Sequence, residues 1–321
     1  MKSKKFLVVG TGSIGSRHIK NLIDLGQTVY AYSQLKKISY LCKKKKNKLI
    51  NKNLDNLMHE VDAIIVSNST NLHLDIIKKG ISNKCDLFIE KPISNNMNGI
   101  KKITNLTKNL IIEVGYQLRC HPNLIFLRKS IQDSKISNIY SYRLIMGHRI
   151  DHWRPGKDYK KLYSSKSDEG GGANFELIHQ LDMAIFLFGN IKQFSSIQGK
   201  VSNFKIVGDD ITQILVKHNS GIVGSIQIDM VSPIYRCEAE IVTKNFIINW
   251  SINTNKIHKI LPNGNKKTIH KINKKFSRND LFIRHMKHFI KRLNNKKIKP
   301  ICSFNEGVES LQIATKIHHK R

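Results

Sequence analysis

The sequence of 321 residues lacks a long apolar run, is poor in acidic side chains and has an odd number of cysteines. It contains no stretch of about eighteen uninterrupted apolar residues, the length from which a membrane-spanning helix is inferred. The opening residues, Met1–Lys5, form a short basic lead into a strand-like segment and do not have the pattern of a signal peptide. We therefore expect no membrane partner.

The cysteines are widely scattered and are not spaced like a metal knuckle or a disulfide framework. They are Cys42, Cys85, Cys120, Cys237 and Cys302. We expect each to be a free thiol that behaves as a small buried hydrophobe. This pattern favours the reducing cytoplasm and predicts no metal site.

Acidic residues are scarce: 23 Asp and Glu stand against 55 Lys and Arg, which gives a formal net charge of +32. Such a charge makes a nucleic-acid partner worth weighing. The excess is mostly lysine, spread along the chain among many Asn and Ile, and all three residues have AT-rich codons. Genomic drift explains this better than selection for binding, and no RNA- or DNA-binding module is recognisable. We expect no nucleic-acid partner, and we expect the run Lys43–Lys46 to lie on the solvated face of a surface helix.

The length and the hydrophobic share of 40% predict two packed domains. Short apolar runs alternate with helical patterns in the first third, which is typical of parallel strands joined by crossover helices. The expected strands are 6–9, 28–32, 63–66, 87–89 and 111–114, and the expected helices include 14–25, 71–80 and 98–107. The fold class is therefore α/β, with an N-terminal doubly wound parallel sheet of the Rossmann type.

The pattern changes near residue 120, which we interpret as a domain boundary. The expected helices beyond it are 122–131, 173–188, 280–293 and 305–317. The expected strands are 138–146, 191–202, 211–217, 222–231, 236–242 and 246–251, most of them antiparallel and joined by hairpin-type turns. We expect a dinucleotide-binding domain over 1–119 and an α+β domain over 120–321, whose last helix is free to pack back on the first domain.

A glycine motif, Gly10-Thr11-Gly12-Ser13-Ile14-Gly15, follows the first strand and opens the first helix. The first glycine permits the tight turn, the second lets the backbone approach a pyrophosphate, and the third lets helix and strand pack closely. The helix N-terminus then offers free amides to the phosphates. The alternative is a purely structural strand-to-helix turn.

The second strand ends at Ser33, where an acidic residue would bind the adenosine ribose of NAD. With Lys36 and Lys37 close behind, this end could accept a 2′-phosphate, so the sequence favours NADP over NAD. The alternative is that both lysines belong to the general basic background.

The triplet Glu90-Lys91-Pro92 comes directly off the carboxyl end of a strand, where open α/β sheets place their ligands. A lysine in such a crevice can donate or accept a proton, whereas by composition alone any lysine of this chain is a surface residue.

A second polar group follows the glycine run 170–172. On one continuous helix Glu176, His179 and Asp182 would share a face, and an imidazole between two carboxylates would be oriented by them. The alternative is a solvated polar face with a bystander histidine.

Taken in order, these motifs resemble the glucose-fructose oxidoreductase, inositol dehydrogenase and rhizopine-catabolism (Gfo/Idh/MocA) family. The resemblance includes the segment 67–71 with His73, and it spans nearly the whole chain. The stretches 114–122 and 153–159 look like the branch of surface-polysaccharide and sugar-nucleotide biosynthesis. The resemblance implies a Rossmann domain, a C-terminal domain with an open antiparallel sheet, and catalytic Lys91 and His179. The family commonly has an Asp four residues before this histidine, whereas this chain has Glu176 three before it.

The resemblance and the motifs together give the expected site. The cofactor-binding residues are Gly10, Gly12, Ser13, Ile14, Gly15, Ser33, Ser67, Asn68, His73, Glu90 and Lys91. The catalytic residues are Lys91, His179 and Glu176, and the substrate-binding residues are Arg119, His121, Trp153, Arg154, Tyr159 and Asp182. We expect NAD(P)-dependent hydride transfer at a hydroxyl or keto carbon of a sugar or sugar nucleotide, in a cytoplasmic homo-oligomer. The alternatives are an inositol or polyol dehydrogenase of the same family and a non-catalytic NAD(P)-binding regulator.

Overall fold

The computed structural model describes most of the chain, and the structural statements below refer to that part. The described residues are 3–33, 38–43, 46–49, 52–107, 109–153, 156, 158–161, 165, 171–176, 178–272 and 276–318. The chain divides into two compact units, one formed by 1–117 with 278–311 and the other by 118–277 with 312–321. The segment 278–311, which the sequence-based division placed in the second domain, thus belongs to the first unit.

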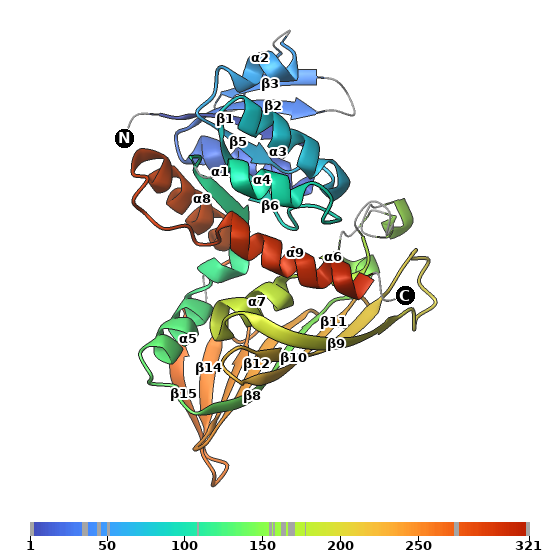
Figure 1. Ribbon diagram of the computed structural model, residues 1–321, viewed down its shortest axis with the longest axis vertical. Coiled ribbons are helices and arrows are strands. Elements are labelled where there is room, and N and C mark those ends of the chain that lie inside the picture. The colour runs from blue at the N-terminus through green and yellow to red at the C-terminus, as the bar shows by residue number, and fades with distance from the viewer. Residues whose placement is uncertain are drawn as a thin grey trace. The chain divides into compact units, whose positions relative to one another are not determined.

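The first unit is built on a parallel sheet, as expected for a doubly wound fold (Figure 1). Its strands are β1 Lys5–Val9, β2 Thr28–Ser33, β5 Ala63–Val66, β6 Asp86–Glu90 and β7 Ile112–Gly115. They lie in the order β2-β1-β5-β6-β7, and each neighbouring pair is parallel. The described residues of β5 and β7 are buried throughout, which is typical of strands covered on both faces.

The surface helix expected around Lys43–Lys46 is wrong, because the described residues Lys43 and Lys46 belong to two strands. They are β3 Ile38–Lys43 and β4 Lys46–Leu49, which add an antiparallel ribbon to the edge of the sheet at β2. The β-branched and aromatic residues of β3 suit a strand, and Cys42 is buried where it pairs with Val29. The lysines around this turn have no apolar pattern from which two strands could be predicted.

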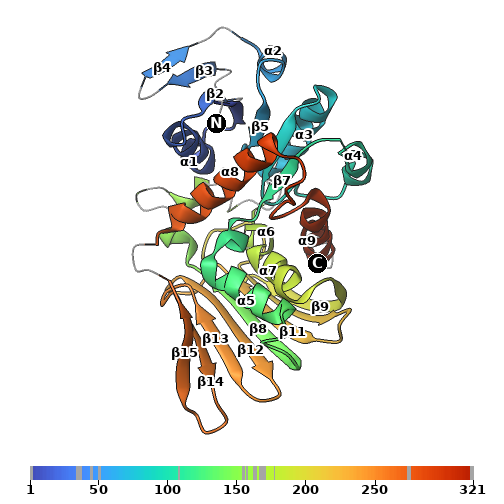
Figure 2. The ribbon, with the colours of Figure 1, turned by 90° about the vertical axis from the view of Figure 1, so that its left-hand side faces the viewer.

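Helices cover both faces of the parallel sheet (Figure 2). One face carries α1 Ser13–Asp24 and α8 Arg278–Asn294, and a shared core joins Leu22 of α1 and Phe289 of α8 to Phe88 of the sheet. The other face carries α3 His73–Ser82, where a Cβ on Gly80 would lie 2.7 Å from Leu87. The remaining helical segments of this unit are α2 Leu54–Met58, the 3-10 turn Thr70–Leu72 and α4 Ile100–Leu106.

A buried carboxylate joins β7 to the C-terminal part of the first unit. Glu113 is fully buried, and its Oε2 lies 2.7 Å from Nη1 of Arg292 on α8. Its Oε1 lies 3.2 Å from Nε2 of His285 and accepts the backbone N–H of Ile301 at 2.7 Å. Burial raises the pKa of Glu113, but hydrogen bonds from His285 and His288 and the charge of Arg292 outweigh it, so the pKa lies well below its usual range.

We expect Glu113→Gln to lower the free energy of unfolding by about 3 to 5 kcal/mol, because it leaves the buried guanidinium of Arg292 without a carboxylate. A depressed pKa contributes stability above the unfolded value of about 4.3, and this contribution is lost as the pH falls toward the folded value. The variant should therefore lose part of the acid dependence of stability below about pH 4.3. Urea unfolding measured from neutral to acid pH tests this. The control is Glu60→Gln, which breaks an exposed pair with Lys52 and should cost no more than about 1 kcal/mol.

The second unit is an eight-stranded, mainly antiparallel sheet within the described residues, which confirms the expected α+β domain. Its order is β15-β14-β13-β12-β8-β11-β10-β9, and β8 with β11 is its parallel pair. The strands are β8 Ile139–Gly147, β9 Ile191–Gly199, β10 Ile211–His218, β11 Val223–Asp229, β12 Arg236–Thr243, β13 Ile247–Ser251, β14 Lys256–Ile260 and β15 Lys266–Lys271. The last two were not expected, because their lysine-rich sequences have little apolar alternation.

Helices lie on one face of this sheet, and the other face is open (Figure 2). The helices are α5 Pro122–Gln132, α6 Ala173–Glu176 and α7 His179–Phe188. Along β10 the side chains alternate, with Val216 buried and Leu215 65% exposed. The last helix, α9 Phe304–His318, is divided between the two units at residues 311 and 312. Within the described residues, no helix combines the length and hydropathy required to span a bilayer.

The single helix expected over 173–188 is wrong, because the described residues form two helices. The first ends at Glu176, Ile178 lies in a turn, and the second begins at His179. Nearly every residue of α7 is buried. Such a segment has no polar stripe, so its periodicity could not reveal the interruption.

Candidate active site

The glycine motif forms a tight turn that leaves one side open. Gly10 has a φ of +95°, and a Cβ there would lie 2.4 Å from the backbone nitrogen of Asn68. A Cβ on Gly15 would lie 1.8 Å from the carbonyl oxygen of Gly10. A Cβ on Gly12, by contrast, would meet no described atom within 4 Å. Gly10 and Gly15 are thus required by packing, while Gly12 faces open space.

The open side of Gly12 is the N-terminus of α1. Gly12 occupies the N-cap position, so no side chain caps the helix, and the first turn, Ser13–Ser16, contains no acidic residue. The amides of Ser13 and Ile14 are among those that an α-helix leaves without an intrahelical partner. A helix N-terminus with these properties suits an anion, and the expected pyrophosphate of a dinucleotide fits the residues present.

The loop after β5 packs against this turn. The hydroxyl of Ser67 lies 3.1 Å from the carbonyl oxygens of both Val9 and Gly10. The side-chain amide of Asn68 donates to the carbonyl of Leu72 at 3.1 Å. Both residues were expected to bind cofactor, and the structure places their side chains where they brace the loop beside Gly10.

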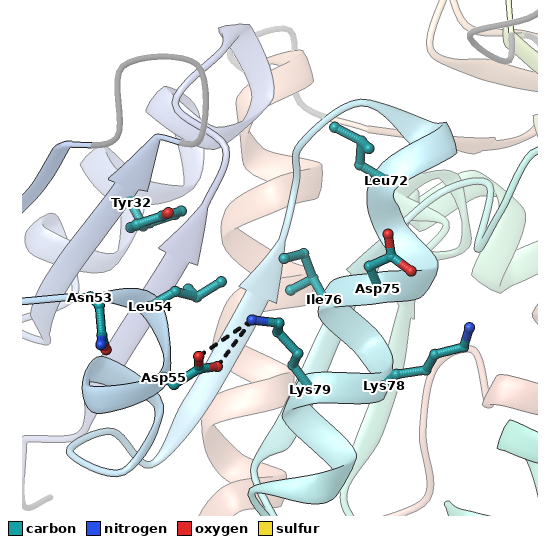
Figure 3. A pocket seen from close by; sticks show the side chains of 9 residues that line it. All are labelled: Tyr32, Asn53, Leu54, Asp55, Leu72, Asp75, Ile76, Lys78 and Lys79. Carbon is teal, nitrogen blue, oxygen red and sulfur yellow. Dashed lines mark hydrogen bonds and ion pairs between the residues drawn. The ribbon is translucent and has the colours of Figure 1, made fainter.

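A pocket of about 560 Å³ lies between the end of β2 and the helices α2 and α3 (Figure 3). Its lining is Tyr32, Asn53, Leu54, Asp55, Leu72, Asp75, Ile76, Lys78 and Lys79. Lys79 reaches across it to Asp55, with Nζ 3.2 Å from Oδ1. Ser33 follows Tyr32 at the end of β2, whereas Lys36 and Lys37 lie outside the described residues. Leu54, Leu72 and Ile76 give this pocket apolar walls. The sequence signal for it was the position of Leu72 directly after the 67–71 motif.

The triplet Glu90-Lys91-Pro92 stands at the carboxyl end of β6, as expected. The Glu90 side chain is buried, and its Oε1 lies 2.7 Å from Nε2 of His18 on α1. Lys91 is half-buried. The carbonyl of Pro92 lies 2.9 Å from Nδ1 of His73, whose Nε2 lies 3.1 Å from the carbonyl of Asn68. His73, expected to bind cofactor, thus bridges two loops of the site.

In the second unit the structure brings together two of the expected substrate-binding residues. Arg119 and Asp182 form a buried ion pair, with Nη2 2.7 Å from Oδ1 and Nε 3.1 Å from Oδ2. This bidentate geometry holds α7 to the segment before α5. Asp182 therefore belongs to an internal pair, which the helix-face argument did not foresee.

Glu176 and His179 stand on either side of the break between α6 and α7. His179 is buried and Glu176 is half-buried. The segment that leads into α6 is held by Asp209, whose Oδ2 accepts the backbone N–H of Asn174 at 3.0 Å. Gly172 has a φ of +93°, and a Cβ there would lie 2.9 Å from Oδ1 of Asp209. Asp209 thus fixes the entry to the segment that carries the expected catalytic histidine.

The other expected substrate residues are anchored individually. His121 is buried and caps α5 through Nδ1, which accepts the N–H of Asn123 at 3.2 Å. Trp153 donates its indole N–H to the carbonyl of His148 at 2.7 Å. The Tyr159 hydroxyl oxygen accepts the N–H of Lys205 at 3.3 Å. Arg154 lies outside the described residues. Among the described side chains, no group of three or more His, Cys, Asp or Glu could hold a metal ion.

Comparison with known proteins agrees with this arrangement. Residues 4–116 match a family described as "Oxidoreductase family, NAD-binding Rossmann fold", and residues 125–248 match the C-terminal domain of the same family. The chain belongs to the Gfo/Idh/MocA family. This membership confirms the resemblance inferred from the motifs.

The relatives of this Gfo/Idh/MocA protein include two inositol dehydrogenases. Myo-inositol 2-dehydrogenase of Thermotoga maritima is 26% identical over 68% of this chain and 66% of the relative. Inositol 2-dehydrogenase of Rhizobium meliloti is 25% identical over the same shares. The chain thus spans just under two thirds of the length of these relatives.

Solved structures with the same fold include UDP-N-acetylglucosamine 3-dehydrogenase from Acidithiobacillus ferrooxidans. It is 14% identical, covers 99% of this chain and 98% of its own, and has a TM-score of 0.77. Levoglucosan dehydrogenase in complex with NADH is 13% identical over 99% and 96%, with a TM-score of 0.80.

The two environments within the glycine motif predict two different phenotypes. We expect Gly12→Val to fold like the parent and to bind NADH or NADPH at least about tenfold more weakly, because its side chain occupies the open side of the turn. Gly15→Ala should instead lower stability by about 1 to 3 kcal/mol, because its Cβ overlaps the carbonyl of Gly10. Thermal melts and fluorescence titration separate these effects. Gly199→Val, at an open glycine of β9, is the control and should change neither by much.

Proposed function

We propose that the chain is an NAD(P)-dependent dehydrogenase that interconverts a hydroxyl and a keto carbon of a sugar or sugar-like polyol. The observation that carries this is the open, uncapped N-terminus of α1 at Gly12, beside a strand end that presents Glu90 and Lys91. Family membership and the names of the relatives support it. The first test is to follow the absorbance of reduced nicotinamide with polyols, free sugars and UDP-sugars as substrates.

The residues of the first unit would hold the dinucleotide. The amides of Gly12, Ser13 and Ile14 would bind the pyrophosphate, with Ser67 and Asn68 bracing the loop beside it. Ser33 would bind the adenosine ribose, and the neighbouring pocket would hold the adenine. When bound, the nicotinamide supplies the redox step, and the protein supplies orientation and proton transfer.

Lys91 and His179 are proposed to manage the proton of the substrate hydroxyl. An amine and an imidazole are both able to accept or donate this proton, and each is partly withdrawn from water. Glu176, across the helix break from His179, is proposed to orient it. Arg119, His121, Trp153, Arg154, Tyr159 and Asp182 remain proposals for the substrate side. For Arg119 and Asp182, the internal ion pair favours an indirect role through the position of α7.

The similarity to inositol 2-dehydrogenases favours a polyol as the second candidate substrate class. The segments 114–122 and 153–159 favour the first, a sugar or sugar nucleotide of surface-polysaccharide biosynthesis. A non-catalytic NAD(P)-binding regulator would have little reason to retain both Lys91 and His179. The homo-oligomeric state and the cytoplasmic location expected from the sequence remain predictions.

Replacing Lys91 by Met or His179 by Asn should lower turnover by about 10²- to 10⁴-fold, because a positioned acid or base contributes about that much. Cofactor affinity should change little. The double variant should lose less than the product of the single losses if both groups serve one proton transfer. The test is to measure kcat and KM separately, by steady-state kinetics, for the parent, the two single variants and the double variant. Near-full turnover in both single variants would remove this mechanism.

NADPH should bind more tightly than NADH, because Ser33 offers no carboxylate to repel a 2′-phosphate and Asp55 in the pocket is already paired with Lys79. Ser33→Asp should reverse the order. Fluorescence titration of both cofactors with both proteins tests this prediction. Ser82→Asp, at the C-terminal end of α3, is the control for the added charge. Ser16→Asp is not a suitable control, because Ser16 lies in the first turn of α1, where the pyrophosphate is expected. A parent protein that prefers NADH by about tenfold or more contradicts the prediction.

A further inference from the structure

Two buried histidines contact the triplet Glu90-Lys91-Pro92 from different helices. His18 of α1 contacts the side chain of Glu90, and His73 of α3 contacts the carbonyl of Pro92. Each of these histidines is 1% exposed. The residues directly before and after Lys91 are therefore each held by a histidine, although neither histidine is adjacent to Lys91 in sequence.

The contact from His18 fixes the side chain of Glu90. Nε2 of His18 lies 2.7 Å from Oε1 of Glu90, within hydrogen-bond distance. The ring meets Phe88 and Phe282 edge-on, with centroid distances of 5.3 and 6.0 Å. On its other side the carboxyl group lies against Gly115, where a Cβ would be 3.0 Å from Cδ of Glu90. Glu90 thus has little freedom to turn.

The contact from His73 fixes the backbone after Lys91. Its two ring nitrogens face two carbonyls, those of Pro92 at 2.9 Å and Asn68 at 3.1 Å. Burial lowers the pKa of His73, while both carbonyls and Glu90 raise it and Lys91 lowers it further. Since carbonyls only accept, the ring donates to at least one of them. His73 consequently ties the loop after β6 to the loop after β5.

The contacts from His18 and His73 come from opposite faces of the parallel sheet. Side chains alternate along β6, so that Phe88 packs in the core shared with α1 and α8, whereas Leu87 lies against Gly80 of α3. A buried polar ring costs more than an apolar one unless its hydrogen bonds are used. Two such rings in contact with one three-residue segment indicate that the position of this segment matters for more than core packing.

We propose that His18 and His73 are positioning residues that together fix the backbone from Glu90 to Pro92. They would thereby set the direction in which the Lys91 side chain projects from the end of β6. The proposal rests on the function proposed above for Lys91. Neither histidine needs to contact substrate or the reacting atoms. They act on Lys91 through its two neighbours in the chain, Glu90 and Pro92.

The test measures the reactivity of the Lys91 amine in the full chain, without a substrate. Acetic anhydride is the probe, and mass spectrometry gives the acetylation rate of Lys91 relative to exposed Lys101 on α4. His18→Phe and His73→Phe keep a ring but remove the hydrogen bonds, and each should change the relative rate at least about threefold. His18→Gln and His73→Asn each retain one donor and should return it toward the parent value.

The matched control is His218→Phe in the second unit. His218 is also 1% exposed, and both of its ring nitrogens are hydrogen-bonded, to Tyr142 and to the carbonyl of Gly189 at 2.7 Å each. Its replacement should lower the melting temperature and leave the Lys91 rate unchanged. Once a substrate is known, the His18 and His73 variants should lose kcat, up to about 10²-fold for a displacement near 1 Å, with little change in cofactor affinity.

Folded Phe variants whose Lys91 rate matches the parent would overturn the proposal and leave both histidines as core residues. If a Phe variant does not melt cooperatively, the corresponding Leu variant replaces it, and failure of that variant to fold also counts against a separable positioning role. Absence of nicotinamide binding and turnover in the parent would instead refute the proposed function. The labelling result is obtained independently, so the two failures are distinguishable.

Discussion

The close approach of backbone to backbone at the β1–α1 turn is the constraint on which the first unit depends. Gly10 lies against the loop after β5, and Gly15 lies against Gly10, at distances that no Cβ could tolerate. This proximity starts α1 directly above the strand ends, leaving its amides open at Gly12. It also sets His18, one turn after Gly15, within reach of Glu90. The turn that forms the anion site therefore also determines how Lys91 is held.

The sequence predicted the elements whose signals are local. The glycine motif, the strand ends and the triplet at residue 90 could be recognised because each combines a residue pattern with its immediate context. The contacts of Glu113 with His285 and of Glu90 with His18 join residues far apart in the chain. A lone histidine in a helix carries no sign of its partner, so these contacts could be found only after folding.

Charge pairing explains why the contacts of Arg119 and Asp182 could not be predicted from the sequence. Arg119 and Asp182 were expected to bind substrate, yet inside the second unit each is the charge partner of the other. Burying either one alone would cost several kcal/mol, so an internal pair is the stable solution for both. The break between α6 and α7 could not be predicted either, because periodicity cannot detect an interruption in a segment that is buried on nearly all sides.

The distribution of charge between interior and surface bears on the net charge of +32. The buried acids among the described residues are Glu90, Glu113, Asp182, Asp209, Asp210 and Asp229, and no lysine is buried there to the same degree. Each of these acids accepts hydrogen bonds from defined groups, as Asp210 does from the N–H groups of Val201 and Ser202. Acids required by the interior have thus been kept, whereas the described lysines lie where solvent screens their charge. A surface that gained lysines wherever the fold allowed them is what compositional drift would produce, and it does not require a binding partner.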